Sequence, residues 1–426
     1  MTSTFTNAAS AAKDRLSGLV SHLTPGGKSA LIAQNPQDVV ICAVARTPIT
    51  RAKKGGFKDS CPEDMLVAVF NAVADRSGIK KEVVEEIQVG SVLAAGGAAT
   101  VSRMAQLAAG YPTTSSIATV NRQCSSGLIA VNHVALQIAA GQIDIGIGAG
   151  VESMTQGYGA GAMPEKFSDT VLECPEAADC LLPMGITSEN VAATYNVSRE
   201  AQDAFAAQSF QRAAAAQKAG KFKEEIVPVK VKVIDPKTEE EHEVVLDRDD
   251  GIRDGVTKES LGKLKPVFSK TGSTHAGNAS QVSDGAAAVL LTRRSKAQEL
   301  GLPILAKFCC VAVAGVEPKL MGIGPAYAIP KVLEKAGISK DDVDLWEINE
   351  AFASQAVMSI EHLGLDYAKV NPNGGAIAFG HPLGATGARQ IATALSEAKR
   401  SGAKIICTSM CIGSGMGAAS LIVNEQ

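Results

Sequence analysis

An internal repeat constrains the fold of this chain more than any other feature of its 426 residues. The segment from Ser77 to Val84 has a counterpart from Ala336 to Val343, and the glycines within them are 337 − 78 = 259 positions apart. In both copies a helix-like stretch ends at glycine, a capped start follows, and an apolar strand comes next. At nearly the same offset, Cys124-Ser-Ser-Gly127 corresponds to Gly384-Ala-Thr-Gly387, each before a helical pattern. A single repeat of this length is not a solenoid and predicts two homologous halves.

Apolar runs mark the strands expected in the two halves, at residues 39–45, 86–89, 143–147, 305–312, 345–348 and 405–407. Several of these runs are continuously apolar, which is typical of sheets covered by helices on both faces. Because the strands alternate with helix-like stretches, we expect an α/β fold with two similar layered sheets.

A long insertion interrupts the first half between about Met154 and Ser280. It contains an alanine-rich helical run from Arg199 to Lys218 and a charged, hairpin-like segment from Val227 to Val245. An insertion of this size is expected to form a lid or a substrate-binding domain. The expected regions are therefore an amino-terminal targeting segment (1–36), a first half (37–154 with about 281–304), an inserted loop domain (155–280) and a second half (305–426).

Composition and charge argue against several classes of function. The net charge of −3 and the pI near 6.1 provide no electrostatic footprint for nucleic acid. No apolar run approaches the ~18 residues that a membrane-spanning helix needs. The nine cysteines are scattered without a Cys-x-x-Cys pair, so neither a disulfide framework nor a zinc site is expected.

Two segments place a reactive side chain close to the start of a helix. In the first, Cys124 directly precedes a helical run, where free N–H groups and the helix dipole are expected to lower the pKa of the thiol. A buried structural cysteine is the alternative. In the second, His381 lies in a glycine-rich loop before a proline, and histidine is suited to proton transfer near neutral pH. A structural histidine is the alternative there.

Two further segments lie at the ends of expected strands. Asn349 follows the strand at 345–348, where its amide could orient a water or a carbonyl, or simply cap a helix. Closely spaced glycines follow Cys411, so backbone N–H groups there can face a substrate oxygen. A phosphate-binding loop is excluded, because the Walker Lys-Ser/Thr ending and the GxGxxG pattern are both missing.

Together these segments resemble the hallmarks of the thiolase family, in the same order along the chain. The matching fragments are Asn-Arg-Gln-Cys-Ser-Ser-Gly (121–127), Asn-Glu-Ala-Phe (349–352), Gly-His-Pro-Leu-Gly (380–384) and Cys-Ile-Gly-Ser-Gly-Met-Gly (411–417). The resemblance extends from about residue 37 to the end. It implies a five-layered α-β-α-β-α fold from two duplicated halves, with an inserted loop domain over the active site. It also implies an oligomer, either a homodimer or a tetramer.

The resemblance implies a reaction and a role for each residue. A 3-ketoacyl-CoA would be cleaved to acetyl-CoA and a shortened acyl-CoA, as in fatty-acid β-oxidation, through an acyl-enzyme on Cys124. His381 would take the proton of Cys124, and Cys411 would be the acid and base for the acetyl carbanion. His381 and a water held by Asn349 would form one oxyanion hole. The backbone N–H groups of Cys124 and Gly413 would form the second.

Coenzyme A (CoA) is expected as a co-substrate, with no tightly bound cofactor and no metal. By family position, Ser280 should meet its pantetheine arm, Phe352 should pack beside that arm, and Arg253 should lie near the nucleotide. Three lysines could contact phosphates, although a solvated charged face is the favoured reading: Lys218, Lys221 and Lys223.

Within the family, the sequence favours the degradative type. Biosynthetic thiolases usually carry a histidine shortly after the Glu-Ser-Met segment, and the stretch 155–160 has none. The alternative is an acetyl-CoA C-acetyltransferase, or acetoacetyl-CoA thiolase, working in the condensing direction. A lipid carrier on the same scaffold should lack a catalytic group, and a ketoacyl synthase needs a Cys-His-His or Cys-His-Asn pattern. The sequence argues against both.

The amino terminus carries a targeting pattern. Arg15-Leu16, five residues and His22-Leu23 resemble the amino-terminal peroxisomal import signal, which a receptor reads from one helical face. The resemblance implies a peroxisomal location and an import receptor as a partner. A mitochondrial presequence is the alternative.

Overall fold

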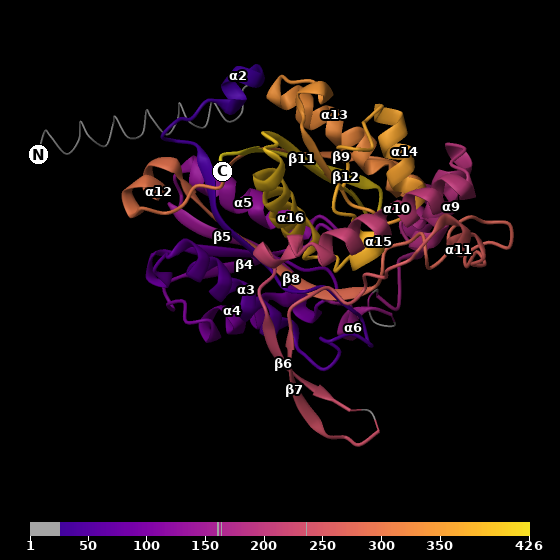
Figure 1. Cartoon of the computed structure of the whole chain (residues 1–426), viewed down its shortest axis with the longest axis horizontal. Helices are drawn as coiled ribbons and strands as arrows, with labels where there is room; N and C mark the ends of the chain where they lie inside the picture. The colour runs from indigo at the N-terminus through magenta and orange to yellow at the C-terminus, as the bar shows by residue number, and fades with distance from the viewer. Residues whose placement is uncertain (1–25, 160–161, 163, 236) are drawn as a thin grey trace, which may run out of the picture.

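The fold is described from a computed structural model, which covers residues 26–159, 162, 164–235 and 237–426. Figure 1 shows the arrangement of the elements along the chain. The import-like pattern at Arg15–Leu23 lies outside the described residues.

The first half alternates strands and helices around one part of a sheet. Its strands are β1 (Val39–Arg46), β3 (Glu86–Gly90), β4 (Ser116–Val120), β5 (Ile145–Ser153) and β8 (Ser283–Arg293), and its helices are α3 (Pro62–Ser77), α4 (Ala99–Ala108) and α5 (Ser126–Ala140). The strand order is β1-β8-β5-β3-β4. Strand β3 is parallel to β4 and β5, whereas β8 is antiparallel to β5 and β1.

The second half repeats this topology. Its strands are β9 (Ala306–Gly315), β10 (Leu345–Ile348), β11 (Ile405–Ile412) and β12 (Met416–Asn424), and its helices are α13 (Gly324–Ala336), α14 (Ala353–Leu363) and α16 (Thr386–Ser401). The order is β9-β12-β11-β10, with β10 parallel to β11 and β12 antiparallel to both of its neighbours. A parallel bridge between Trp346 and Val370 stands where β4 stands in the first half. The predicted duplication is confirmed.

The glycines that defined the repeat end equivalent helices. Gly78 follows α3 with φ 71°, and Gly337 follows α13 with φ 67°. This left-handed conformation is the usual end of a helix, and glycine adopts it without steric cost. The two copies of the repeat thus end their helices α3 and α13 in the same way.

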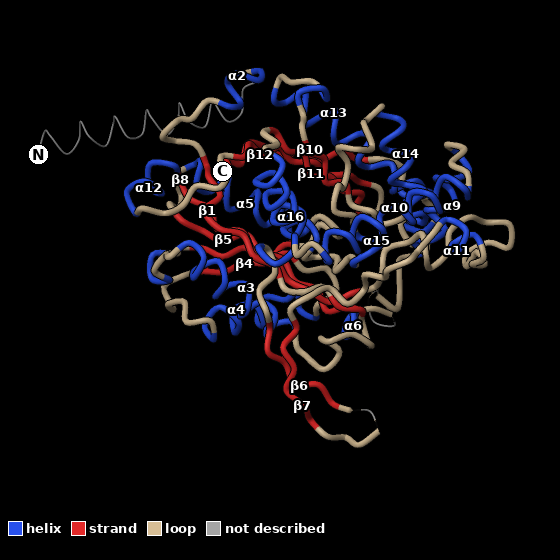
Figure 2. Tube along the Cα trace, in the orientation of Figure 1, coloured by secondary structure: helices blue, strands red, loops and turns tan. Residues whose placement is uncertain are grey.

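Helices form three layers around the strands. The outer helix α3 shares an apolar core with one face of the first half. Helices α5 and α16 share a core with strands of both halves, and Figure 2 shows them between the two groups of strands. Helices α13 and α14 cover the remaining face of the second half. The five-layered α-β-α-β-α arrangement predicted from the resemblance is therefore confirmed.

The two groups of strands are not fully separate sheets, which differs from the prediction. Val40 pairs with Lys307 and Ile41 with Ala306, so hydrogen bonds join β1 to β9 over these pairs. The contact is confined to one corner because α5 and α16 hold the rest of the two strand groups apart. Each half still keeps its own topology.

The insertion lengthens the connection between strands β5 and β8. Ile145 of β5 pairs with Thr292 of β8, which are 292 − 145 = 147 positions apart. The equivalent pair in the second half, Ile405 and Val423, is only 423 − 405 = 18 positions apart. Within its described residues, the insertion forms helices and a two-stranded hairpin and adds no strand to the large sheet. Its elements are α6 (Met154–Gly157), α7 (Asp169–Leu172), α8 (Pro175–Asp179), α9 (Met184–Thr194), α10 (Arg199–Lys218), β6 (Val229–Ile234), β7 (Glu241–Leu246) and α11 (Lys258–Gly262).

The predicted helix at Arg199–Lys218 and the predicted hairpin are both present, and Figure 1 shows β6 and β7 projecting from the body. The remaining short α-helices and strand are α2 (Gly27–Ile32), β2 (Thr50–Arg51), α12 (Arg294–Leu300) and α15 (Ala376–Phe379). Short 3-10 helices are η1 (Lys81–Val83), η2 (Ala95–Ala98), η3 (Lys221–Glu224), η4 (Pro318–Ile323) and η5 (Lys340–Asp342). Among the residues that the structure describes, every helix is too short or too polar to cross a membrane.

Candidate active site

Cys124 lies in a tight turn between β4 and α5. Gln123 has a left-handed φ of 48°, which is costly for a residue with a side chain and is typical of functional turns. The hydroxyl of Ser126 accepts from the N–H of Arg122 at 2.9 Å and donates to the carbonyl of Gln123 at 2.6 Å. The partly exposed Cys124 side chain is thereby held at a defined place, and its sulfur accepts a hydrogen bond from the N–H of Gly413.

The predicted lowering of the Cys124 pKa is wrong. Burial raises the pKa of this thiol to about 11, the N–H of Gly413 opposes the increase, and the negative charge of Glu152 adds to it. The thiol packs beside apolar core residues, and this burial has a larger effect on its pKa than the nearby N–H groups. Cys124 is therefore a thiol at neutral pH and needs a base to become a nucleophile.

A short loop between β11 and β12 brings Gly413 to this thiol. Ile412 pairs with Met416, so three residues make the turn, and Ser414 and Gly415 have φ values of 64° and 85°. Cys411 lies on β11 just before the loop and is fully buried. Burial raises the pKa of the Cys411 thiol well above its usual range, and the neighbouring Cys124 adds to the increase. A proton is thus held on Cys411 at neutral pH.

The tautomer of His381 follows from its two hydrogen bonds. Nδ1 lies 2.6 Å from the hydroxyl oxygen of Thr386, and that hydroxyl donates to the carbonyl of Pro382 at 3.0 Å. The Thr386 oxygen must therefore accept, which puts the ring proton on Nδ1. On the other side, Nδ2 of Asn349 donates to Nε2 at 3.3 Å. Nε2 consequently carries a lone pair that can take a proton.

The surroundings keep His381 uncharged. Burial lowers the pKa of its imidazole to about 3, and the nearby guanidinium of Arg389 contributes to the decrease. Asn349 is also buried, and its Oδ1 has no hydrogen-bond partner among the described residues. A neutral base and a free amide oxygen thus lie side by side.

Close backbone packing brings the histidine loop against the cysteine helix. A Cβ placed on Gly127 would lie 2.6 Å from the carbonyl oxygen of Gly384, and one on Gly150 would lie 2.1 Å from it. Only glycine permits these approaches. The loop that carries His381 therefore rests on the first turn of α5, close to Cys124.

The three predicted CoA contacts are only partly brought together. Ser280 is partly exposed, and its N–H donates to the carbonyl of Ala351 at 2.9 Å, beside Phe352. Phe352 packs on the small apolar cluster that contains Cys411. Arg253 is exposed, and its guanidinium lies 4.8 Å from the ring centroid of Phe210, away from these residues.

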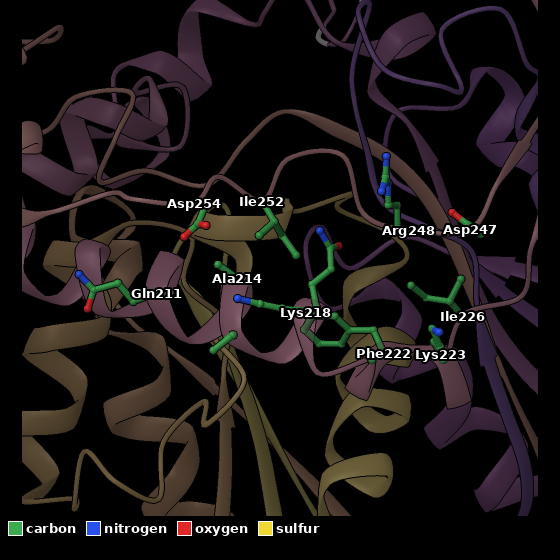
Figure 3. Close-up of a pocket in the computed structure, with 13 residues that line it drawn as sticks. Gln211, Ala214, Lys218, Phe222, Lys223, Ile226, Asp247, Arg248, Ile252 and Asp254 are labelled. Atoms are coloured by element: carbon green, nitrogen blue, oxygen red, sulfur yellow. The ribbon is translucent and has the colours of Figure 1, made fainter.

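A separate cavity of about 750 Å³ lies beside Arg253. Figure 3 shows the side chains that α10 and the segment 247–254 contribute to it, including Lys218 and Arg248. Lys223 also lines it, whereas Lys221 instead contacts Asn373 at 3.0 Å. The eight predicted site residues are not among its lining residues.

Two residues of the site carried no predicted role. Thr386 sets the tautomer of His381, and it occupies the place of Ser126 in the repeat, so the repeat itself contained a signal for it. Glu152 accepts one hydrogen bond from the histidine loop, from the N–H of Gly384, but nothing in the sequence shows that its side chain reaches across the two halves. Within the described residues, no group of His, Cys, Asp and Glu side chains is arranged to hold a metal ion.

Comparison with known proteins places the chain in a family. The thiolase N-terminal domain profile matches residues 39–295 and the thiolase C-terminal domain profile matches residues 302–424. The chain is 59% identical over 415 residues to the peroxisomal 3-ketoacyl-CoA thiolase of Yarrowia lipolytica, covering 97% of this chain and 100% of the relative.

Two solved structures extend the comparison to the fold. The dimeric peroxisomal thiolase of Saccharomyces cerevisiae superimposes with a TM-score of 0.87 at 48% identity, covering 93% of this chain and 100% of the other. A second structure, the peroxisomal 3-ketoacyl-CoA thiolase of the same yeast, is described as five-layered, with two core domains of identical topology. It gives a TM-score of 0.76 at 43% identity, covering 92% of this chain and 100% of the other. The chain belongs to the thiolase family.

Proposed function

We propose that this protein cleaves 3-ketoacyl-CoA with CoA, giving acetyl-CoA and a shortened acyl-CoA in peroxisomal fatty-acid β-oxidation. The observation that carries the proposal is the pairing of two thiols, Cys124 and Cys411, with the neutral, proton-accepting Nε2 of His381. The names of the relatives support the degradative activity and the peroxisomal location over the condensing and mitochondrial alternatives.

The first half-reaction moves the acyl group to the enzyme. His381 Nε2 takes the proton of the Cys124 thiol, and the sulfur attacks C3 of the substrate. The N–H groups of Cys124 and Gly413 donate to the resulting alkoxide. When the C2–C3 bond breaks, its electron pair becomes the enolate of acetyl-CoA. A thioester remains on Cys124, and it stays reactive towards a second thiol.

The enolate then needs a stabilised oxygen and a proton at carbon. The N–H now at Nε2 of His381 donates a hydrogen bond to the enolate oxygen and keeps its proton. In this proposal a water donates one hydrogen to the same oxygen and the other to the buried Oδ1 of Asn349, which has no hydrogen-bond partner among the described residues. Cys411 gives its proton to C2 and releases acetyl-CoA. Its resulting thiolate removes the proton of incoming CoA, whose sulfur attacks the thioester. Cys124 leaves as a thiolate and takes back its proton from Nε2 of His381, which restores the starting state.

CoA is the co-substrate, and the chain offers contacts along the length of such a molecule. We place its pantetheine arm beside Ser280 and Phe352, whose segments are joined by backbone hydrogen bonds. We place its charged nucleotide end near Arg253. The adjacent cavity is lined by three cationic side chains and two anionic ones (Lys218, Lys223, Arg248, Asp247 and Asp254), so its small excess of positive charge favours an anionic ligand. In this proposal the inserted residues 155–280 act as the CoA-binding domain.

We propose a homodimer formed through the outer edge of β4. This edge strand carries no charge and no proline, so it lacks the usual features that prevent pairing with another chain. Ala118 in the middle of β4 is exposed, and the related yeast thiolase is described as dimeric. Ala118→Lys should shift sedimentation from dimer to monomer, and an unchanged dimer would contradict this interface. The same sedimentation measurement distinguishes a dimer from a tetramer by mass.

The peroxisomal location would depend on residues 1–36, and an import receptor that reads Arg15–Leu23 is part of the proposal. Fusing residues 1–36 to a fluorescent protein should send it to peroxisomes. Changing His22 and Leu23 together to alanine should abolish this import. Import that survives the double change would refute the assigned signal.

The activity is tested by chain-length preference. We expect thiolysis of C8–C16 3-ketoacyl-CoA to exceed that of the C4 substrate. Equal or lower rates on the longer chains would instead support the acetoacetyl-CoA-specific type. Cys124→Ser should abolish turnover in either case while leaving binding of CoA esters largely unchanged.

A further inference from the structure

A buried carboxylate connects the two halves next to the proposed active site. Glu152 is the penultimate residue of β5, and it is only 1% exposed. It accepts hydrogen bonds from the backbone N–H groups of Val92 and Leu93, each at 3.0 Å. It accepts a third from the N–H of Gly384 at 2.8 Å, and Gly384 belongs to the second half. One side chain of the cysteine half thus holds the histidine loop of the other.

The backbone of Gly384 is restrained on both of its polar sides. Its N–H is bound to Glu152, while its carbonyl oxygen rests against Gly127 and Gly150 without space for a single Cβ. Gly384 is three positions after His381. A shift of this glycine would therefore move the imidazole relative to Cys124.

We propose that Glu152 is a positioning residue that sets His381 against Cys124 across the two halves. The proposal rests on the proposed thiolase function, because it assigns a partner to the base of that reaction. Glu152 touches neither the substrate nor the reacting atoms. It acts through the loop that carries His381.

The charge of Glu152 provides a way to separate this role from general stability. Burial raises the pKa of Cys124, and the negative charge of Glu152 raises it further. Burial also raises the pKa of Glu152 itself to about 7, against the effect of its N–H donors. Loss of the charge should therefore make the thiol easier to ionise, while loss of the anchor should slow turnover. The alkylation rate of Cys124 should therefore rise while kcat falls.

Two variants divide the effects. Glu152→Gln removes the charge and leaves one acceptor oxygen, so fewer of the three N–H groups keep a partner. Glu152→Asp keeps the charge but is shorter by one methylene group, so the carboxylate cannot reach Gly384 and Leu93 together. Hydrogen bonds to a charged group typically make a difference equivalent to about 10- to 100-fold. We expect kcat for thiolysis to fall by this factor in both variants.

Asp284→Asn is a matched control. Asp284 is a buried carboxylate on the neighbouring strand β8, and it accepts from the N–H of Thr155 at 2.8 Å. It pairs with Ser153 rather than with Glu152, so its side chain points to the opposite face of the sheet. This change removes a buried charge and one of two acceptor oxygens at the same sheet without touching Gly384.

The experiment measures kcat and the rate of alkylation of Cys124 by iodoacetamide across pH 6–10, on full-length protein. We expect Glu152→Gln to lower kcat and to raise the alkylation rate at pH 8. Glu152→Asp should lower kcat with an unchanged alkylation profile, and Asp284→Asn should change neither. Turnover near the wild-type value in either Glu152 variant would overturn the proposal. An alkylation rate that falls together with kcat would overturn it as well. Wild-type protein without thiolysis would instead refute the proposed function.

Discussion

The hydroxyl of Thr386 offers a direct test of how the base is prepared. The change is Thr386→Val, which keeps the shape of the side chain and removes the oxygen that lies 2.6 Å from Nδ1 of His381. In the variant, the Nδ1 proton of a buried imidazole has no acceptor. Moving that proton to Nε2 would instead destroy the lone pair that takes the proton of Cys124. Both outcomes reduce the population of the active form.

The size of the effect follows from the burial of the group. An unsatisfied buried donor costs about 1–3 kcal/mol. Since each 1.4 kcal/mol is a factor of ten, this cost corresponds to about a 5- to 150-fold lower kcat. KM should change little, because Thr386 is buried behind the imidazole and has no route to the substrate. The free energy of unfolding should fall by a similar ~1–3 kcal/mol.

Steady-state thiolysis and chemical denaturation measure the two quantities, with Thr386→Ser as the matched control. Serine keeps the hydroxyl and should stay close to wild type in both assays. If Thr386→Val retained a kcat within twofold of the wild type, the assignment of the proton to Nδ1 would be wrong. Equal losses in the serine and valine variants would show that packing, not the hydrogen bond, matters.

Three further outcomes follow from the structure. Gly127→Ala puts a Cβ 2.6 Å from the carbonyl of Gly384, so we expect lost turnover and a lower melting temperature, whereas Gly262→Ala, with open space around it, should behave as wild type. Because the pKa of Cys124 is raised to about 11, its alkylation rate should rise about tenfold per pH unit from pH 6 to 9, and a plateau below pH 8 would contradict this. Asp249→Asn leaves a buried arginine with one carboxylate partner, so the free energy of unfolding should fall by ~3–5 kcal/mol in urea melts; a loss under ~1 kcal/mol would contradict the buried ion pair.

The architecture was largely predictable because the repeat and the apolar runs act locally. The strand at 345–348 and the helix at 199–218 have the predicted bounds, and glycines end α3 and α13 as expected. The strands β4, β8 and β12 were not predicted. Strand β4 mixes small and polar residues, and β8 and β12 are rich in alanine, so none forms a long run of large apolar side chains. Strand β5 begins two positions later than predicted and continues to Ser153.

The residues of the site were predictable only where the residue type and its local sequence indicate a chemical role. Cysteines and a histidine in glycine-rich turns indicate reactivity, and the structure brings Cys124, Cys411, His381 and Asn349 into one region. The pKa of Cys124 was predicted to be lowered, whereas it is raised. Its two causes, burial and the carboxylate of Glu152, which is remote in the sequence, depend on the tertiary fold. The contact between Glu152 and Gly384 spans 232 positions and has no local sequence pattern.

The central claim is that the sulfur of Cys124 carries the acyl group between the two half-reactions. The most direct measurement is peptide mass analysis after brief incubation with a 3-ketoacyl-CoA in the absence of free CoA. We expect an acyl adduct on the peptide containing Cys124, its disappearance when CoA is added, and no adduct in Cys124→Ala. An unmodified Cys124 peptide, or undiminished thiolysis by the alanine variant, would contradict the account.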